Sequence, residues 1–158
     1  FGDERCVPPD HPESNYRMAR EKLLDRVSPA SVHRMAAELG AEQAAADYDR
    51  VVAFHQPLGL VLLGIGEDGH TASLFPGSPA LRAQGWAVAV HGAPKPPPDR
   101  VSLTLGALRA ARRVLFLATG EGKAGAVAAA ARGEVPAGLV AGAEWLLDRA
   151  AASRLETA

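Results

Sequence analysis

The chain has 158 residues and a formal net charge of −1, because 17 lysine and arginine residues oppose 18 aspartate and glutamate residues. This length suits one domain, and the hydrophobic share of 47% is typical of a chain that folds around a core. With a net charge near zero, the sequence shows no electrostatic footprint for nucleic acid or an anionic membrane. The single cysteine, Cys6, excludes an internal disulfide framework and a multi-cysteine zinc site.

No apolar run approaches the roughly 20 residues that a membrane-spanning helix needs, and no basic and apolar leader marks the chain for secretion. We therefore expect a soluble protein in a reducing compartment, the cytoplasm. The chain opens on Phe1-Gly2-Asp3-Glu4-Arg5, an apolar and charged start without an initiator methionine. Such a start is typical of a chain joined in mid-domain, so either an upstream segment is absent or the fold tolerates an abrupt beginning.

Two helices are expected in the first third of the chain. Ser14 is a suitable N-cap for the first, whose apolar residues over 16–27 have helical spacing, and Pro29 ends the run. The second is predicted over Ala41–Phe54, where apolar side chains fall on one face, and Pro57 stops it.

Strands are expected further along. Residues 58–65 (LGLVLLGI) form a continuous apolar run too short for a helix, as expected of a strand buried on both faces of a parallel sheet. Weaker strands are predicted over residues 86–90, 114–118 and 144–147, and a helix over 123–132 lies between the last two. This alternation predicts an α/β fold with a largely parallel sheet.

A glycine-rich loop follows the first of these strands. Residues 64–69 spell G-x-G-x-x-G, the pattern of a dinucleotide-binding turn. That interpretation requires a long helix after the glycines, which Pro76 and Pro79 interrupt, and an acid about 20 residues further on. The next acid after Asp68 is Asp99. A nicotinamide site is therefore not expected.

The same loop carries Asp68 and His70, beyond the carboxyl end of a strand, where open α/β sheets bind ligands. Histidine titrates near neutral pH, so His70 is suited to take a proton from water and return it. In the alternative interpretation, His70 packs on its neighbours and Asp68 only caps the following turn. The residues alone leave both interpretations open.

Six blocks of the chain occur in a recognisable order: GDER at residues 2–5 with VP at 7–8, SNY at 14–16, LGIGEDGHTASLFPG at 63–77, APKPPPDR at 93–100, TGEGKA at 119–124 and WLLDRAA at 145–151. Together they closely resemble 6-phosphogluconolactonase, in the glucosamine/galactosamine-6-phosphate isomerase superfamily. The family's N-terminal part, with a phosphate-binding loop rich in serine, glycine and threonine, has no counterpart here. Residues 1–158 are thus expected to form a single domain, the C-terminal portion of the family domain.

The resemblance implies a three-layer, Rossmann-like, open and mostly parallel sheet flanked by helices, of the sugar-phosphate isomerase type. It also implies hydrolysis of 6-phospho-D-glucono-1,5-lactone to 6-phospho-D-gluconate, the second step of the oxidative pentose phosphate pathway. The expected partner is this small phosphosugar lactone, with no nucleic acid, no membrane, no metal and no cofactor. The sequence makes no prediction of the oligomeric state.

The resemblance also assigns catalytic roles. His70 is expected to activate water as a base and then to protonate the leaving oxygen. Asp3 is expected to orient His70 or the water and to offset the imidazolium charge, and Arg5 to hold Asp3 in place. Asp68 is expected to fix the loop or to contact substrate hydroxyls. Without the resemblance, Asp3 and Arg5 would be read as a surface ion pair.

Substrate-binding roles are expected for a second group of residues. Backbone N–H groups from Gly66 to Gly69 are predicted to receive the developing oxyanion. Arg100 and Lys123 are predicted to bind the phosphate, Lys123 with the stronger claim because it lies at a strand-to-helix junction; on composition alone both would be solvated surface cations. Asn15 either hydrogen-bonds sugar hydroxyls or helps to cap its helix.

Two alternative functions remain at this point. Glucosamine-6-phosphate deaminase, a sister family, resembles the chain around Asp68 and His70 but has a carboxylate five residues after that histidine, where this chain has Phe75. Because an apolar ring transfers no protons, the difference favours the lactonase. The other alternative is a non-catalytic domain that binds sugar phosphates. Cys6 as a nucleophile would require a lowered pKa.

Overall fold

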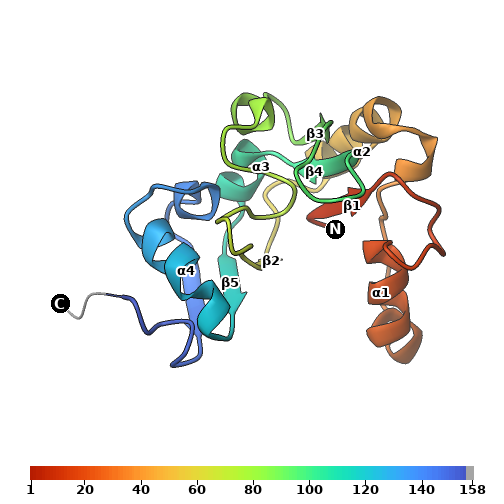
Figure 1. Cartoon of the computed structure of the whole chain (residues 1–158). Helices are drawn as coiled ribbons and strands as arrows, with labels where there is room; N and C mark the ends of the chain where they lie inside the picture. The colour runs from red at the N-terminus through yellow and green to blue at the C-terminus, as the bar shows by residue number, and fades with distance from the viewer. Residues whose placement is uncertain (156–158) are drawn as a thin grey trace.

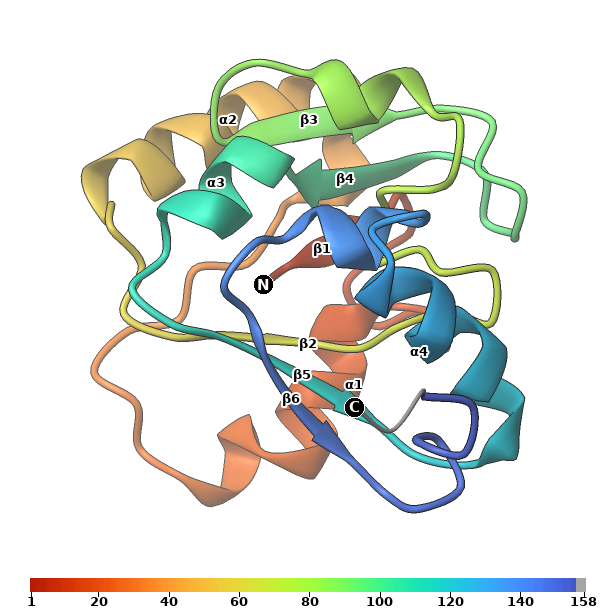
Figure 2. The same cartoon turned by 90° about the vertical axis from the view of Figure 1, so that its left-hand side faces the viewer.

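Two small sheets of three strands each, one parallel and one antiparallel, organise the chain. The computed structural model describes residues 1–155, and Figures 1 and 2 show it from two directions. The parallel sheet has the order β2-β5-β6 and is formed by Val61–Leu63, Val114–Ala118 and Glu144–Leu147. β5 and β6 have the predicted bounds, whereas β2 is shorter than the apolar run at 58–65.

The second sheet has the order β1-β4-β3, and its strands are Asp3–Arg5, Arg100–Leu103 and Ala87–Val90. The predicted α/β fold, with a parallel sheet and flanking helices, is confirmed. The sequence predicts a largely parallel sheet, but two of the four strand pairs are antiparallel. The antiparallel sheet is therefore a feature that the sequence does not predict. β1 (DER) consists of charged residues and β4 (RVSL) includes an arginine and a serine, so neither stands out as an apolar run.

The α-helices are α1 (Asn15–Lys22), α2 (Ala41–Phe54), α3 (Leu105–Ala110) and α4 (Ala124–Ala131). The Ser14 hydroxyl accepts the N–H of Arg17 and so caps α1 as predicted. α1 ends at Lys22, earlier than the predicted run to residue 27, and none of its residues is buried. α3, only six residues long, is not predicted by the sequence.

Short 3-10 turns complete the connections between these elements. Each is three or four residues long, which is the usual length of such turns. Their bounds are Leu24–Arg26, Ala37–Leu39, Pro79–Arg82, Glu121–Lys123 and Pro136–Leu139. Within residues 1–155, no helix is long and apolar enough to cross a membrane.

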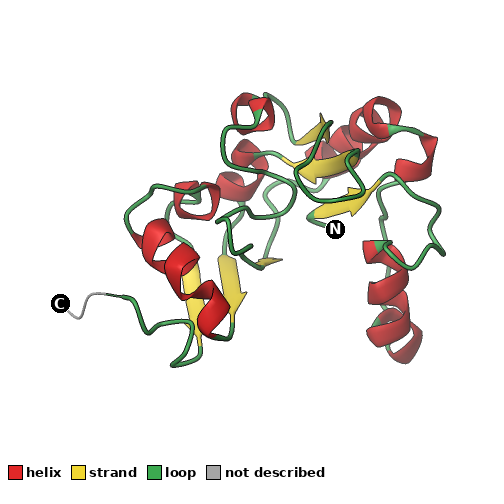
Figure 3. Cartoon of the chain, viewed as in Figure 1, coloured by secondary structure: helices red, strands yellow, loops and turns green. Residues whose placement is uncertain are grey.

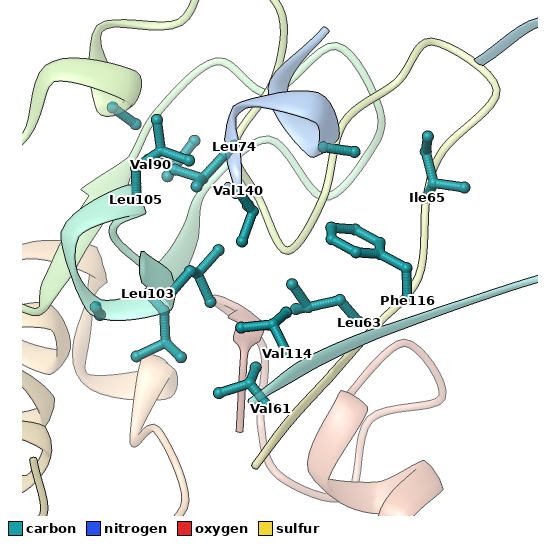
Figure 4. Packing of buried hydrophobic residues seen from close by; sticks show 14 of the residues in the cluster. Val61, Leu63, Ile65, Leu74, Val90, Leu103, Leu105, Val114, Phe116 and Val140 are labelled. Atoms are coloured by element: carbon teal, nitrogen blue, oxygen red, sulfur yellow. The ribbon is translucent and has the colours of Figure 1, made fainter. Parts of the chain in front are cut away.

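The hydrophobic core lies between the two sheets. Figure 4 shows side chains of β2 and β5, among them Leu63 and Val114, on one side and residues of the antiparallel sheet, among them Leu103, on the other. Phe116 of β5 is fully buried and stacks on Trp145 of β6, with ring centroids 4.2 Å apart. α2 packs on β3 and β4 and covers the antiparallel sheet, as Figure 2 shows.

A long loop between β2 and β3 enters this core. Figure 3 shows in green that the centre of the molecule is crossed by loops and not by further strands. Leu74, on this loop, is fully buried and lies among the core side chains in Figure 4. Because Leu74 anchors the loop, the residues just before it, including His70, have a fixed position relative to both sheets.

Candidate active site

A pocket of about 300 Å³ opens where the two sheets meet. It lies beyond the carboxyl ends of β2 and β5, as expected for an open α/β sheet. Of the nine site residues that the sequence predicts, all but Asp68 and Gly69 line it. Its lining consists of Asp3, Arg5, Asn15, Gly64, Ile65, Gly66, His70, Ala72, Lys95, Arg100 and Lys123.

A second hollow, of about 350 Å³, lies elsewhere, between α2 and the chain start. Its lining is largely apolar, with Val32, Val51 and Leu58 among its residues, and it contains none of the predicted site residues. The smaller pocket is therefore the candidate site, because it gathers the groups that carry chemistry.

His70 is held by the carboxylate that precedes it by two residues. Its Nδ1 lies 2.5 Å from Oδ1 of Asp68, and the same oxygen accepts the His70 backbone N–H at 3.4 Å. Partial burial acts to raise the pKa of Asp68, but hydrogen bonds and charge from His70, with the charge of Lys95, outweigh it and lower that pKa. With Nδ1 engaged, Nε2 is the ring nitrogen left for a substrate or water.

This pairing changes the roles expected of the two carboxylates. Asp68 was expected to fix the loop or to contact hydroxyls, and Asp3 to orient His70 or the water. Among the described residues, His70 has its carboxylate contact with Asp68 and none with Asp3. Asp68 and His70 lie in the same turn, so their side chains are neighbours. Asp3 reaches the pocket from another segment, β1.

The imidazole ring also rests on an aromatic platform. The centroid of the His70 ring lies 4.5 Å from that of Phe75, and the two planes are tilted by 31°. Phe75 is buried, and the guanidinium carbon of Arg100 lies 5.5 Å from its ring centroid. The platform and Asp68 together restrict the orientation of His70.

Two glycines allow the loop to close around His70. A Cβ atom on Gly66 would overlap the His70 ring and the Asp68 carboxylate, and Gly69 has a φ of +81°, which favours glycine. The N–H of Gly66 donates to the carbonyl of His70 at 2.8 Å, and that of Gly69 to the carbonyl of Gly66 at 3.0 Å. The N–H groups of Gly66 and Gly69, two of those predicted to receive the oxyanion, are thus used in closing the tight loop.

Asp3 is fixed by donors from two other segments. Oδ2 accepts the Ser73 hydroxyl at 2.7 Å, and Oδ1 accepts Nδ2 of Asn15 at 3.1 Å. Nη1 of Arg100 lies 4.0 Å from Oδ2. The Asn15 amide was expected to contact sugar hydroxyls or to assist the helix cap. Its Nδ2 instead donates to the carboxylate and to the backbone carbonyl of Asp3.

Arg5 does not hold Asp3, contrary to the prediction. Its Nη1 donates to the carbonyl of Glu13 at 2.7 Å, and no ion pair joins Arg5 to Asp3 among the described residues. The Asp3 carboxylate has donors from Ser73 and Asn15 instead. Nε of Arg5 is buried without a hydrogen-bond partner, and the residue lines the pocket.

Glu4 is a buried carboxylate that the sequence analysis did not single out. It accepts the N–H groups of Asn15 and Tyr16, each at 2.7 Å, and the Ser14 hydroxyl at 3.0 Å. Glu4 thereby binds the N-terminal end of α1 to β1, a favourable place for an anion. The one signal available was its position between Asp3 and Arg5 in a block that resembles the family.

Arg100 is mainly a structural cation. Burial, followed by the nearby charge of Arg5, lowers its pKa, but a guanidinium stays charged at neutral pH. Its Nε and Nη2 donate to the carbonyls of Lys95, Pro96 and Pro97. Most of its donors therefore hold the proline-rich loop, and only Nη1 is directed at Ser73 and Asp3.

Two lysines face the pocket from opposite segments. Lys95, which the sequence analysis did not assign, lies on the proline-rich loop with Nζ 3.9 Å from Oδ1 of Asp68. Lys123 directly precedes α4, as its predicted place at a strand-to-helix junction requires. Both place positive charge where an anionic substrate would lie.

Cys6 has the properties of an inert thiol. Burial, with the charges of Asp99 and Glu4, raises its pKa to about 11. It also lies outside the pocket lining. A thiolate nucleophile at this position is therefore not supported.

Known proteins of one family match this chain. A family model described as glucosamine-6-phosphate isomerases/6-phosphogluconolactonase matches residues 1–147. A protein named 6-phosphogluconolactonase from Streptomyces coelicolor is 45% identical over 179 residues, 98% of this chain and 69% of that protein. Its namesake from Homo sapiens is 44% identical over 172 residues, 98% of this chain and 67% of that protein.

A solved structure agrees with these relatives. The 6-phosphogluconolactonase from Trypanosoma brucei has a TM-score of 0.79 at 32% identity, covering 99% of this chain and 73% of that one. The family model spans most of the chain, and the solved structure shares its fold. The chain therefore belongs to the glucosamine-6-phosphate isomerase/6-phosphogluconolactonase family.

Proposed function

We propose that this chain hydrolyses 6-phospho-D-glucono-1,5-lactone to 6-phospho-D-gluconate, with His70 activating the water. The observation that carries the mechanism is the Asp68–His70 pair, 2.5 Å apart, at a pocket lined by cations. The curated relatives named 6-phosphogluconolactonase support the reaction. The reaction belongs to the oxidative pentose phosphate pathway, and a cytoplasmic location stays a prediction.

The chemistry needs one group that first accepts and then returns a proton. Water attacks C1 of the lactone, Nε2 of His70 takes its proton, and the carbonyl oxygen becomes an oxyanion. When the carbonyl re-forms, the bond from C1 to the ring oxygen breaks, and His70 gives the proton to that oxygen. Asp68 keeps Nδ1 protonated and offsets the imidazolium charge between the two transfers.

Two lysines are assigned to the two anionic groups of the reacting substrate. We assign the oxyanion to Lys95, because its ammonium lies beside the Asp68–His70 pair and the Gly66 and Gly69 N–H groups are occupied. We assign the phosphate to Lys123, whose position before α4 adds the positive end of a helix dipole. Asp3 faces the pocket as an acceptor for the attacking water or a sugar hydroxyl.

The deaminase alternative has less support. At the position where that family has a carboxylate, this chain has Phe75, which is buried under the His70 ring. An apolar ring in this place orients the imidazole and transfers no proton. The curated relatives named above are lactonases, and a non-catalytic binding domain would not require the intact Asp68–His70 pair.

The test compares the chain with His70→Ala. Freshly generated lactone is added to each, and the rate of hydrolysis is measured above the spontaneous rate. We expect the chain to accelerate hydrolysis and His70→Ala to lose about 100-fold or more in kcat, the usual contribution of a general base. Equal acceleration by both would remove His70 from the mechanism.

Two further measurements separate the alternatives. Release of ammonia from glucosamine 6-phosphate would support the deaminase. A rise in melting temperature with 6-phosphogluconate, without turnover of either substrate, would support the binding domain.

A further inference from the structure

Ser73 lies three residues after His70, yet it does not line the pocket. Its side chain is fully buried, and its hydroxyl is 2.7 Å from Oδ2 of Asp3. Asp3 is 70 positions away in the sequence, so this bond joins the histidine loop to β1. A carboxylate accepts only, which makes the hydroxyl the donor.

Ser73 is itself held in place by β4 and by the core. Its backbone N–H donates to the hydroxyl of Ser102 at 3.1 Å, and Ser102 is the residue paired with Asp3 across β1 and β4. The next residue, Leu74, is fully buried in the core. The position of the Ser73 hydroxyl is therefore fixed by the loop and the core. The Asp3 carboxylate takes its orientation from this hydroxyl.

The other neighbours of Asp3 make longer contacts with its carboxylate. Nδ2 of Asn15, the first residue of α1, donates to Oδ1 at 3.1 Å. Nη1 of Arg100 is 4.0 Å from Oδ2, too far for a hydrogen bond, and 3.5 Å from the Ser73 oxygen. The bond from Ser73 is the shortest of these and the one that comes from the histidine loop.

We infer that Ser73 is a positioning residue for lactone hydrolysis: its hydroxyl fixes the Asp3 carboxylate relative to His70. The inference rests on the proposed function and adds to it a residue outside the pocket. Asp3 enters the pocket from β1 and His70 from the loop after β2, so their separation depends on a link between those segments. Ser73 is that link, and catalysis is sensitive to small errors in such distances.

Ser73 does not act as a nucleophile. Its side chain is inaccessible, and its hydroxyl proton is already directed at Asp3. It therefore acts through Asp3 and not on the lactone, and its loss should lower kcat and leave substrate binding nearly unchanged.

The main variant is Ser73→Ala, and the matched control is Thr104→Val. Thr104 is also fully buried, and its hydroxyl bonds the carbonyl of Gly85 and caps α3, away from the pocket. We expect Ser73→Ala to lower kcat about tenfold with KM changed less than about twofold, the scale of a lost bond to a charged group. Thr104→Val should lower the melting temperature and keep kcat.

A double-mutant cycle tests whether the effect passes through Asp3. We expect Ser73→Ala to cost little further kcat in an Asp3→Asn background, because the group that it positions is gone. Two outcomes would overturn the inference while the proposed function stood. In one, Ser73→Ala has the kcat of the parent chain. In the other, Ser73→Ala lowers kcat by the same factor with and without Asp3→Asn. If Ser73→Ala does not fold, the isosteric pair Ser73→Thr and Ser73→Val replaces it, and equal kcat in both would overturn it.

The parent chain separates the two claims. Turnover by the chain and loss in Ser73→Ala support both claims. If the chain itself does not hydrolyse the lactone, the proposed function fails and the role of Ser73 fails with it. The rate of the parent chain is therefore measured first, in the same assay as the variants.

Discussion

The chemistry of this site begins with two residues in one turn. Asp68 and His70 are two positions apart, so their contact depends on local loop geometry and needs no distant strand. Gly66 makes that geometry accessible, because the His70 ring and the Asp68 carboxylate occupy the space of a Cβ atom at this position. The base and its partner are therefore specified by a short stretch of sequence.

Gly66→Ala should impair catalysis more than stability. The added methyl group would push the His70 ring and the Asp68 carboxylate from their positions, and a displacement of about 1 Å lowers kcat about 100-fold. Steady-state kinetics and a melting curve measure the two effects. Gly59→Ala is the control, because no atom lies within 4 Å of the corresponding Cβ. Full activity in Gly66→Ala would show that the imidazole tolerates displacement.

At the scale of elements, adjacent residues of β1 have two different roles, one in the pocket and one in holding α1. Asp3 faces the pocket, whereas Glu4 is buried and binds the first turn of α1. Alternation along a strand directs neighbouring side chains to opposite faces, so a three-residue strand serves both the site and the helix. The position of Asn15, the first residue of α1, depends on this contact.

Glu4→Gln is expected to destabilise the fold. The amide retains the shape of the carboxylate but loses the charge that three donors of α1 and its cap contact. The free energy of unfolding should fall by about 1–3 kcal/mol, the usual cost at a buried charged acceptor. Urea unfolding measures it. Glu21→Gln on the same helix is the control, because its ion pair with Arg17 is exposed. Equal stability of Glu4→Gln and the parent would contradict this account.

The sequence predicted elements with a long or apolar pattern and missed those without one. α2, β5 and β6 have the bounds expected from periodicity and apolar runs. β1 was missed because its three residues are charged, and α3 because six residues are too few to show helical periodicity.

The candidate site shows the same division. His70, Asp3 and Lys123 were expected at the site and line one pocket. Lys95 and the contacts of Asp3 with Ser73 and Asn15 were missed, because no local pattern indicates which segments of the chain meet in space.

At the scale of the whole molecule, the pocket is a junction of both sheets. β1 and β4 supply Asp3 and Arg100 from the antiparallel sheet, and the segments after β2 and β5 supply His70 and Lys123 from the parallel sheet. Neither sheet holds a complete site. Its geometry depends on the core between the sheets, in which Phe116 stacks on Trp145.

The stability of the molecule should depend slightly on pH through His91. Hydrogen bonds from its ring to Glu42 of α2 and Asp99 before β4 raise its pKa above the ordinary 6.5. The stabilisation is therefore complete below pH 6.5 and is lost as pH rises through the raised pKa. Because the ring is exposed, we expect at most about 0.5 kcal/mol.

The measurement is the unfolding free energy of the parent chain and of His91→Gln at pH 5.5 and pH 8.5. The difference between the two proteins should be larger at pH 5.5 and should shrink in about 1 M salt. A difference that grows with pH would contradict the assignment of the charge to His91.

The grip of Arg100 on three successive carbonyls has a kinetic consequence. Because these bonds hold the backbone at Lys95, Pro96 and Pro97, we expect this loop to keep its position when the substrate binds. The Lys95 ammonium is thus presented to an arriving lactone before it binds, and its backbone needs no closing step. We therefore expect substrate entry and product release on this side of the pocket to require no movement of the loop backbone.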